Sequence, residues 1–174
     1  AMTLDDLPAG LANLALAEPK LAGALNGEVT IQGPVGTPRA DWTLSADDLE
    51  APETKLPPLN ARVSGQLADG RLTTEARVAG LSDTPLRLTA AVPMRASVAP
   101  LAATLEADAP ISGQVQWQGE LAPIVPLIPV SGHRLGGSAA VDMKLGGTLA
   151  EPEPDGTITL TDVVYENLSA GTLL

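Results

Sequence analysis

The residues that most often carry enzymatic or metal chemistry are few in this sequence, and they lack the spacing that such chemistry needs. His133 is the only histidine and there is no cysteine. His133 therefore has no second histidine or cysteine with which it could bind a metal or activate a nucleophile. We expect His133 to be a loop residue. Asp47, Asp48, Glu50 and Glu53 form the densest acidic group, but their spacing differs from that of an EF-hand calcium loop. A solvated acidic turn is the expected role for them.

Other catalytic signatures are equally lacking in the sequence. It contains no glycine-rich phosphate loop, no nucleophile elbow and no carboxylate pair with credible spacing. We therefore expect a protein that is not an enzyme and that needs no cofactor and no metal.

Composition narrows the range of partners. Among 174 residues, 21 are acidic and 10 are basic, which gives a formal net charge of −11. This charge repels duplex nucleic acid and anionic membrane surfaces. Aromatic residues make up 2% of the chain, so a platform that stacks single-stranded bases is also disfavoured. We expect no nucleic-acid partner, and an apolar surface built from Leu, Val, Ile and Ala.

Most of the chain consists of short segments in which polar and apolar residues alternate, separated by Gly and Pro. Alternation with a period of two predicts half-buried β-strands, and the Gly and Pro residues predict the turns between them. We expect an all-β, elongated, curled and mostly antiparallel sheet in which sequential neighbours pair. The apolar positions of the alternating segments are predicted to line one concave face: Val29, Ile31, Leu44, Leu72, Val78, Leu86, Leu88, Val115, Val141, Met143, Leu145, Ile158 and Leu160.

Two segments do not show clear alternation. Residues 4–17 are compatible with a short helix or with the start of a strand. Residues 121–130 are apolar and interrupted by prolines, and they are too short to span a membrane. For them we expect one short helix or turn, near 121–128, that plugs one end of the sheet.

The sequence also repeats itself. Residues 21–50 and 134–164 align with an offset of 114, which places Gly23 on Gly137, Asp48 on Asp162 and the apolar Val29 on Met143. The repeated unit is a strand, a Gly, a short spacer ending in Pro, and a second strand. Stacked units of this kind form an elongated sheet, because a single unit cannot bury its apolar face alone. We expect residues 1–174 to form a single elongated unit.

Residues 134–174, which include the second copy of the repeat, resemble the signature of the TamB family, the AsmA-like translocation and assembly module proteins of Gram-negative bacteria. The first copy matches less sharply, and Trp42 stands where the family pattern has Gly. The matching positions in residues 134–174 are Gly147, Thr148, Leu149, Pro152, Gly156, Thr157, Ile158, Leu160, Asp162, Tyr165, Glu166, Asn167 and Leu168.

This resemblance implies a location, a fold and partners. It implies a periplasmic segment of a long protein that is anchored in the inner membrane, and the abrupt ends of the sequence lead us to expect an excised segment. The family fold is a curled sheet with an apolar interior, often called a β-taco. Family members are linked to phospholipid movement between the two membranes and to assembly of outer-membrane proteins with a TamA-like Omp85 partner.

Two interpretations of the apolar face remain open at this stage. In the first, the face is a groove that conducts phospholipid acyl chains or holds outer-membrane protein strands. In the second, it is the sealed core of a β-sandwich with a structural or adhesive role. An open cavity along the sheet would favour the first interpretation, and apolar side chains that face each other across a packed interior would favour the second.

Overall fold

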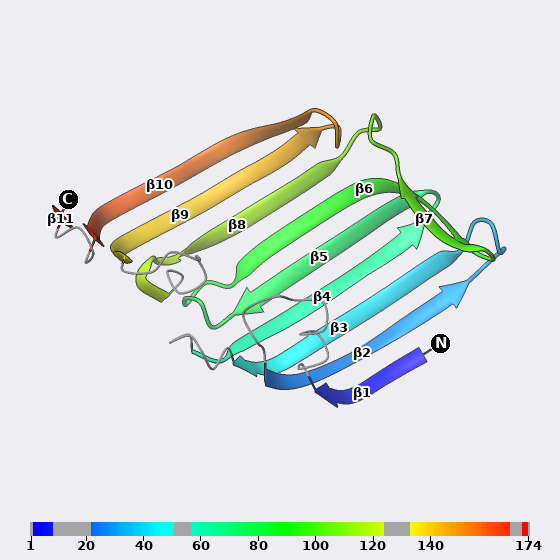
Figure 1. Cartoon of the computed structure of the whole chain (residues 1–174), viewed down its shortest axis with the longest axis horizontal. Coiled ribbons are helices and arrows are strands. Elements are labelled where there is room, and N and C mark those ends of the chain that lie inside the picture. The colour runs from blue at the N-terminus through cyan, green and yellow to red at the C-terminus, as the bar shows by residue number, and fades with distance from the viewer. Residues whose placement is uncertain (1, 9–21, 51–56, 124–132, 168–171, 174) are drawn as a thin grey trace.

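The computed structural model describes residues 2–8, 22–50, 57–123, 133–167 and 172–173. These residues form an almost purely antiparallel β-sheet, which confirms the predicted all-β fold. Figure 1 shows the strands lying side by side, mostly in chain order. The strands are β1 (Met2–Pro8), β2 (Ala22–Gln32), β3 (Arg39–Glu50), β4 (Leu59–Ala68), β5 (Arg71–Ala79), β6 (Leu86–Val98), β7 (Leu101–Leu105), β8 (Ser112–Glu120), β9 (His133–Gly147), β10 (Pro152–Asn167) and β11 (Thr172–Leu173).

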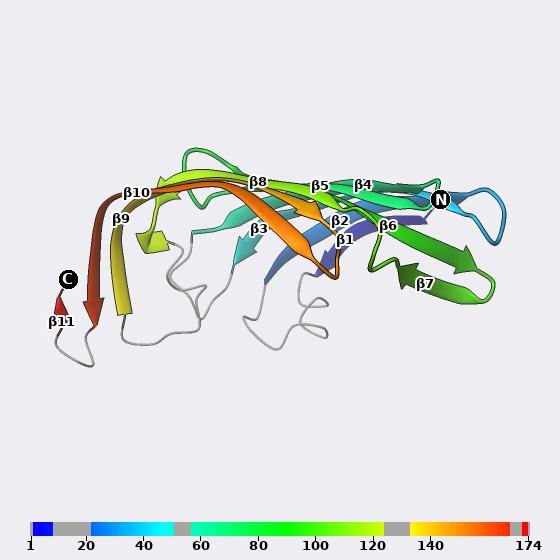
Figure 2. The ribbon, with the colours of Figure 1, turned by 90° about the horizontal axis from the view of Figure 1, so that it is seen from above.

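The order across the sheet is β1-β2-β3-β4-β5-β6-β8-β9-β10-β11, and β7 pairs only with the end of β6. Each strand therefore pairs with its neighbour in sequence, apart from the side branch formed by β7. The sheet does not close into a barrel. Figure 2 shows it nearly edge-on as a curled layer, with the ends of β9 and β10 bending to the same side as β7.

The two hairpins β2–β3 and β9–β10 have the same register. Val29 lies opposite Trp42 in the first hairpin, and the equivalent Met143 lies opposite Gly156 in the second. The internal repeat predicted from sequence is therefore a repeat of strand pairing as well.

Both hairpins also carry a β-bulge at the same place. Asp48 and Asp162 have φ angles of 50° and 49°, a left-handed conformation that aspartate tolerates better than most residues do. The glycines that face these bulges, Gly23 and Gly137, have φ angles of 137° and 93°. A bulge adds one residue to one strand and bends it. In Figure 2 the far ends of β9 and β10 bend away from the plane of the sheet.

The core of the described residues is small. Trp117, Leu121 and Ala139 form its centre, and Leu86, Leu135 and Val141 pack against them while remaining partly exposed. None of the described large side chains has less than 2% of its surface exposed. Most of the apolar surface is therefore half-covered by its neighbours within one sheet.

Three local expectations from the sequence need correction or comment. His133 is the first residue of β9 and pairs with Asn167, so it is not a loop residue. Asp47, Asp48 and Glu50 lie in β3 near a bulge, not in a turn, because pairing with β2 extends as far as Glu50. Glu53 lies outside the described residues.

The two segments without alternation are only partly described. Residues 2–8 form β1, so the strand alternative holds for the part of 4–17 that the structure describes, and residues 9–21 lie outside it. Ala122 and Pro123 have 3₁₀ conformation, and residues 124–132, which hold most of the expected short helix, lie outside the described residues. No helix among the described residues is long and apolar enough to cross a membrane.

Candidate functional site

The most extended chemical feature of the structure is a continuous apolar face. Residues directly opposite each other in neighbouring antiparallel strands point to the same side of a sheet. One unbroken series of such partners crosses the sheet from β2 to β10, and we call it the central row. It consists of Gly27, Leu44, Val63, Ala76, Leu88, Val115, Met143 and Gly156.

All of the groove-lining residues predicted from the sequence lie on the face that contains the central row, which we call the apolar face. Val29, Ile31, Leu72, Val78 and Leu86 join it through their pairing with β3, β4 and β5. The rest join through the pairing of β8, β9 and β10: Val115, Val141, Met143, Leu145, Ile158 and Leu160. Leu44 and Leu88, like Val115 and Met143, are members of the central row itself.

Exposure on this face increases toward the open ends of the sheet. The predicted residues on β5, β6 and β8, and Val141 and Met143 of β9, are half-buried. At the β10 side, Ile158 is 61% exposed and Leu160 is 58% exposed. None of the predicted residues is fully buried. This is expected for side chains that contact their neighbours within the same sheet and have no second layer above them.

The apolar face lies on the concave side of the sheet. Leu121 follows β8 directly and packs on Trp117 and Ala139, which belong to the apolar face by their register. Figure 2 shows the segment that follows β8 on the side toward which the sheet curls. The apolar face is therefore the inner side of the curled sheet.

Some members of this face were not among the predicted residues. Val63 and Ala76 occupy the centre of the row, between Leu44 and Leu88. Alternation in the β4 segment, where Ala61, Val63 and Leu67 are separated by polar residues or glycine, carries the signal that could have identified Val63.

Trp42 and Gly65 fit together on the neighbouring row of the apolar face. A Cβ atom added to Gly65 would lie 2.6 Å from Cε2 of Trp42, so the indole occupies the space that a side chain on β4 would need. Gly27 of β2 similarly leaves room for the side chain of Leu44. On the apolar face, these two glycines therefore leave space for large side chains that extend over them from the neighbouring strand.

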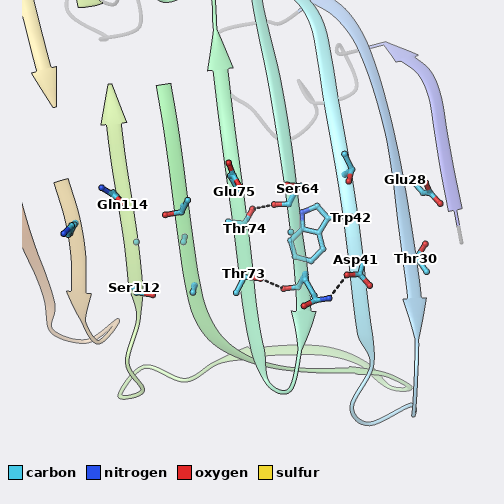
Figure 3. A pocket seen from close by; sticks show the side chains of 18 residues that line it. Glu28, Thr30, Asp41, Trp42, Ser64, Thr73, Thr74, Glu75, Ser112 and Gln114 are labelled. Atoms are coloured by element: carbon cyan, nitrogen blue, oxygen red, sulfur yellow. Dashed lines mark hydrogen bonds between the residues drawn. The ribbon is translucent and has the colours of Figure 1, made fainter. Parts of the chain in front are cut away.

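The opposite face is polar and carries a hollow. A hollow of about 900 Å³ lies over β2 to β9, lined on its polar side by acids, amides and hydroxyl groups. Figure 3 shows Glu28, Thr30, Asp41, Glu75 and Gln114 on the strands around this hollow. A twisted sheet is saddle-shaped, so each face can be concave in a different direction.

Amide side chains on the polar face hold carboxylates in place. Gln66 Nε2 donates a hydrogen bond to Asp41 Oδ1 at 2.7 Å. Gln114 Nε2 and Gln116 Nε2 donate to the two carboxylate oxygens of Asp142, at 3.0 and 3.3 Å. The bond from Gln114, followed by the bond from Gln116 and the charge of Lys144, lowers the pKa of Asp142.

We expect that replacing Gln114 and Gln116 with alanine will raise the pKa of Asp142 toward that of an unperturbed aspartate. The Asp142 carboxyl has a lower pKa in the folded protein than in the unfolded chain. Its contribution to the free energy of unfolding is therefore fully present at a pH above the pKa of the unfolded chain. This contribution is lost as the pH falls through the pKa of the folded protein, in the range below about pH 4. A ¹³C NMR titration of the carboxyl group measures the shift. An unchanged titration in the double variant would mean that the amides do not stabilise the carboxylate.

Among the residues that the structure describes, no group of three or more His, Cys, Asp or Glu side chains is placed so that it could hold a metal ion. The acidic residues near the β3 bulge are exposed to solvent.

The last feature is an open edge of the sheet along β10. On its inner side, β10 pairs with β9 from Pro152 to Asn167, and on its outer side β11 pairs only with Glu166 and Asn167. Among the described strands, none lies beside residues 152–164, all of which are exposed. An open strand edge presents backbone donors and acceptors to any incoming extended chain.

Comparisons with protein-family models, with curated proteins and with solved structures return no match for this chain. The features that bear on its function are the apolar face, the polar face and the edge of β10.

Proposed function

We propose that this chain is a periplasmic segment of a TamB-like protein anchored in the inner membrane, and that its apolar face conducts phospholipid acyl chains toward the outer membrane. The resemblance of the second repeat to the family signature supports the assignment to that class. The observation that carries the proposal is the central row, which is aliphatic or glycine at every position from β2 to β10.

The size of the row suits an acyl chain. Strands in a sheet lie about 4.8 Å apart, so the row is roughly 34 Å long. An acyl chain of about 15 methylenes that crossed water uncovered would cost roughly 12 kcal/mol, at about 0.8 kcal/mol for each methylene. A continuous aliphatic surface removes much of this barrier, and it need not bind tightly, because a membrane offers the chain a similar environment.

The arrangement of strands supports an open trough more than the closed β-sandwich that the sequence left possible. The described strands follow a single path in one sheet that does not close. The exposed leucine and isoleucine side chains on the apolar face, such as Ile158, are available to a ligand in a way that a packed core does not allow.

Two measurements test the acyl-chain proposal. We expect mass spectrometry of the purified protein to detect co-purifying phospholipid. We also expect a fluorescent fatty acid to bind with a blue-shifted emission and to be displaced by phospholipid. Absence of lipid together with an unshifted probe would contradict conduction of acyl chains by this face.

A second candidate function is suggested by the β10 edge, which none of the described strands covers between residues 152 and 164. The same chain would hold strands of outer-membrane proteins during assembly, with a TamA-like partner acting on the full-length protein. Strand addition at an open edge uses main-chain hydrogen bonds for affinity and alternate side chains for specificity. The apolar face and the β10 edge would then serve different parts of the same protein's function.

A further inference from the structure

Three arginines stand directly opposite one another on the polar face. Arg62 of β4 pairs with Arg77 of β5, and Arg77 pairs with Arg87 of β6. We call these three residues the arginine row. Figure 1 shows β4, β5 and β6 side by side in the middle of the sheet, where β3 covers one flank of the three strands and β8 covers the other. The row is therefore independent of both edges of the sheet.

No described carboxylate neutralises the arginine row. All three arginines are exposed, and none of them forms an ion pair with a described residue. Elsewhere in the described structure, Arg39 pairs with Asp69, and Arg95 pairs with Glu106. Like charges directly opposite each other on neighbouring strands are destabilising. In a chain with 21 acidic and 10 basic residues, this concentration of unpaired positive charge indicates a site for an anion.

The two ends of the row carry groups that can donate hydrogen bonds. Ser45 lies opposite Arg62 at one end, and Gln116 lies opposite Arg87 at the other. Beyond Gln116 lies Asp142, whose carboxylate accepts hydrogen bonds from two glutamine side chains. It stands two strands from Arg87, a separation of roughly 10 Å. The acid on this side is thus held by amides and not by the arginine row.

One acid lies beside the middle of the row. Glu75 precedes Arg77 by two residues on the same face of β5, roughly 7 Å along the strand. Ser64 and Thr89 flank Glu75 on the neighbouring strands, and all three residues line the hollow of about 900 Å³. The row therefore borders open space. Its three guanidinium charges and the one carboxylate charge leave a local charge of about +2.

We propose that the arginine row binds the phosphate group of a phosphate monoester. Each guanidinium can donate two parallel hydrogen bonds to a phosphate, a geometry that a lysine does not offer. A monoester carries nearly two negative charges at neutral pH, which matches the local charge of the site. Arg62 and Arg87 stand roughly 10 Å apart, two strand spacings, so their long side chains can converge on one phosphate above Arg77.

The site lies on the opposite side of the sheet from the central row. Val63, Ala76 and Leu88 of the central row are the sequence neighbours of the three arginines, so their side chains point to the apolar face. A phospholipid whose acyl chains lie on the apolar face cannot place its own phosphate on the arginine row. The inference is therefore independent of acyl-chain conduction.

The test is calorimetric titration of the intact chain with glycerol 3-phosphate, at about pH 7.5 and about 0.1 M ionic strength. We expect saturable binding that weakens as salt is added. Arg77→Gln should weaken binding at least about tenfold, because it removes a charged donor. Arg77→Lys should weaken it less, since the charge remains and only the paired donors are lost. Glu75→Gln should tighten binding about two- to fivefold, because it removes the neighbouring negative charge.

Arg71→Gln is the matched control for Arg77→Gln. Arg71 lies on the same face of β5, roughly 20 Å along the strand from Arg77, and it donates to Ser112 Oγ at 3.3 Å. The change in net charge is the same, but screening at this distance should leave binding nearly unchanged. Equal losses in Arg71→Gln and Arg77→Gln would mean a general effect of charge and would overturn the proposal.

Thermal unfolding separates a ligand site from a structural role of the row. Without ligand, Arg77→Gln should melt at the same temperature as the wild type or higher, because it relieves repulsion between like charges. Glycerol 3-phosphate should raise the melting temperature of the wild type but not that of Arg77→Gln. A lower melting temperature of Arg77→Gln without ligand would show that Arg77 stabilises the fold itself, and it would overturn the proposal.

Vesicles distinguish the two sources of such a phosphate. We compare sedimentation of the protein with phosphatidylcholine vesicles that contain phosphatidic acid, a monoester, or phosphatidylglycerol, a diester. Binding of glycerol 3-phosphate alone supports a soluble phosphate ester as the ligand. Additional binding to phosphatidic acid vesicles, lost in Arg77→Gln, supports a lipid headgroup. Binding of neither probe would overturn the proposal, while fluorescent fatty acid should bind Arg77→Gln like the wild type, so the two sites fail separately.

Discussion

Replacing Trp117 with alanine is expected to lower the free energy of unfolding by about 3 kcal/mol or more. The indole is 8% exposed and forms the core cluster with Leu121 and Ala139. The described part of the chain has no second cluster of this kind to compensate, since its other apolar residues are mostly half-covered. A loss of this size is a large fraction of the stability of an ordinary domain.

Urea denaturation followed by far-UV circular dichroism measures this effect, and two further variants serve as controls. Trp42→Ala removes the same side chain from a half-buried position and should cost less. Trp117→Phe should cost less than Trp117→Ala, because Nε1 of Trp117 is buried with no hydrogen-bond partner among the described residues. Removing an unsatisfied buried donor relieves part of the cost of the lost volume. Equal losses for Trp42→Ala and Trp117→Ala would show that the cluster is not the centre of stability.

The orientation of the apolar face could be predicted from the sequence because it depends only on local alternation. Each strand places alternate residues on opposite faces, so Leu72 and Val78 had to share a side with one another. Direct pairing then placed Leu72 beside Leu67 and Val78 beside Ala61. A slip of one residue in register would have exposed an entire apolar set, and this penalty makes the register predictable.

The ends of the strands were harder to predict. We expect His133 in a loop because the sequence offers it no metal or catalytic partner, yet pairing with Asn167 extends β9 to include it. Asp48 and Asp162 interrupt the alternation at the bulges, and an acidic residue next to another polar residue looks the same in a bulge as in a turn. Tertiary pairing decides between these outcomes, and a single strand does not contain that information.

Whether the sheet stays open was not predictable from alternation at all. A strand with one apolar face has the same pattern in a sandwich, where a second sheet covers that face, as in an open trough. The repeat gave the only sequence signal, because stacked hairpins favour an elongated sheet. The aligned pairs Gly23 with Gly137 and Asp48 with Asp162 lie at the bulges of the two hairpins, although the sequence predicts an acidic turn at Asp48.

Placing one positive charge in the middle of the central row is expected to interrupt acyl-chain binding without unfolding the protein. Leu88 is half-buried and lies between Ala76 and Val115. In Leu88→Arg the long side chain can rise away from the sheet toward solvent, since its stem is aliphatic and its charged end can reach water. We expect a folded protein with a modest loss of stability.

The expected loss of binding in Leu88→Arg is roughly tenfold, because a hydrated guanidinium keeps about two methylenes of the ligand from the surface, at about 0.8 kcal/mol each. Leu145→Arg should have a smaller effect, since Leu145 is 39% exposed and lies beside the central row between Gly113 and Pro154. Displacement of the fluorescent fatty acid measures both. On the proposed function, both variants placed in the TamB-like protein are expected to impair outer-membrane integrity.

Thr89→Arg is the matched control for these variants, because it adds the same charge one residue away, on the polar face beside Gln114. It should bind fatty acid like the wild type. A loss of binding in Leu88→Arg alone would then place the ligand on the apolar face and would exclude a general effect of net charge.

If Leu88→Arg and Leu145→Arg are both folded and bind as the wild type does, the conduction proposal fails. If both aggregate while Thr89→Arg stays soluble, the apolar residues are covered by a packed interior, since only there does an unpaired charge cost several kcal/mol. The closed-core interpretation would then be the better one.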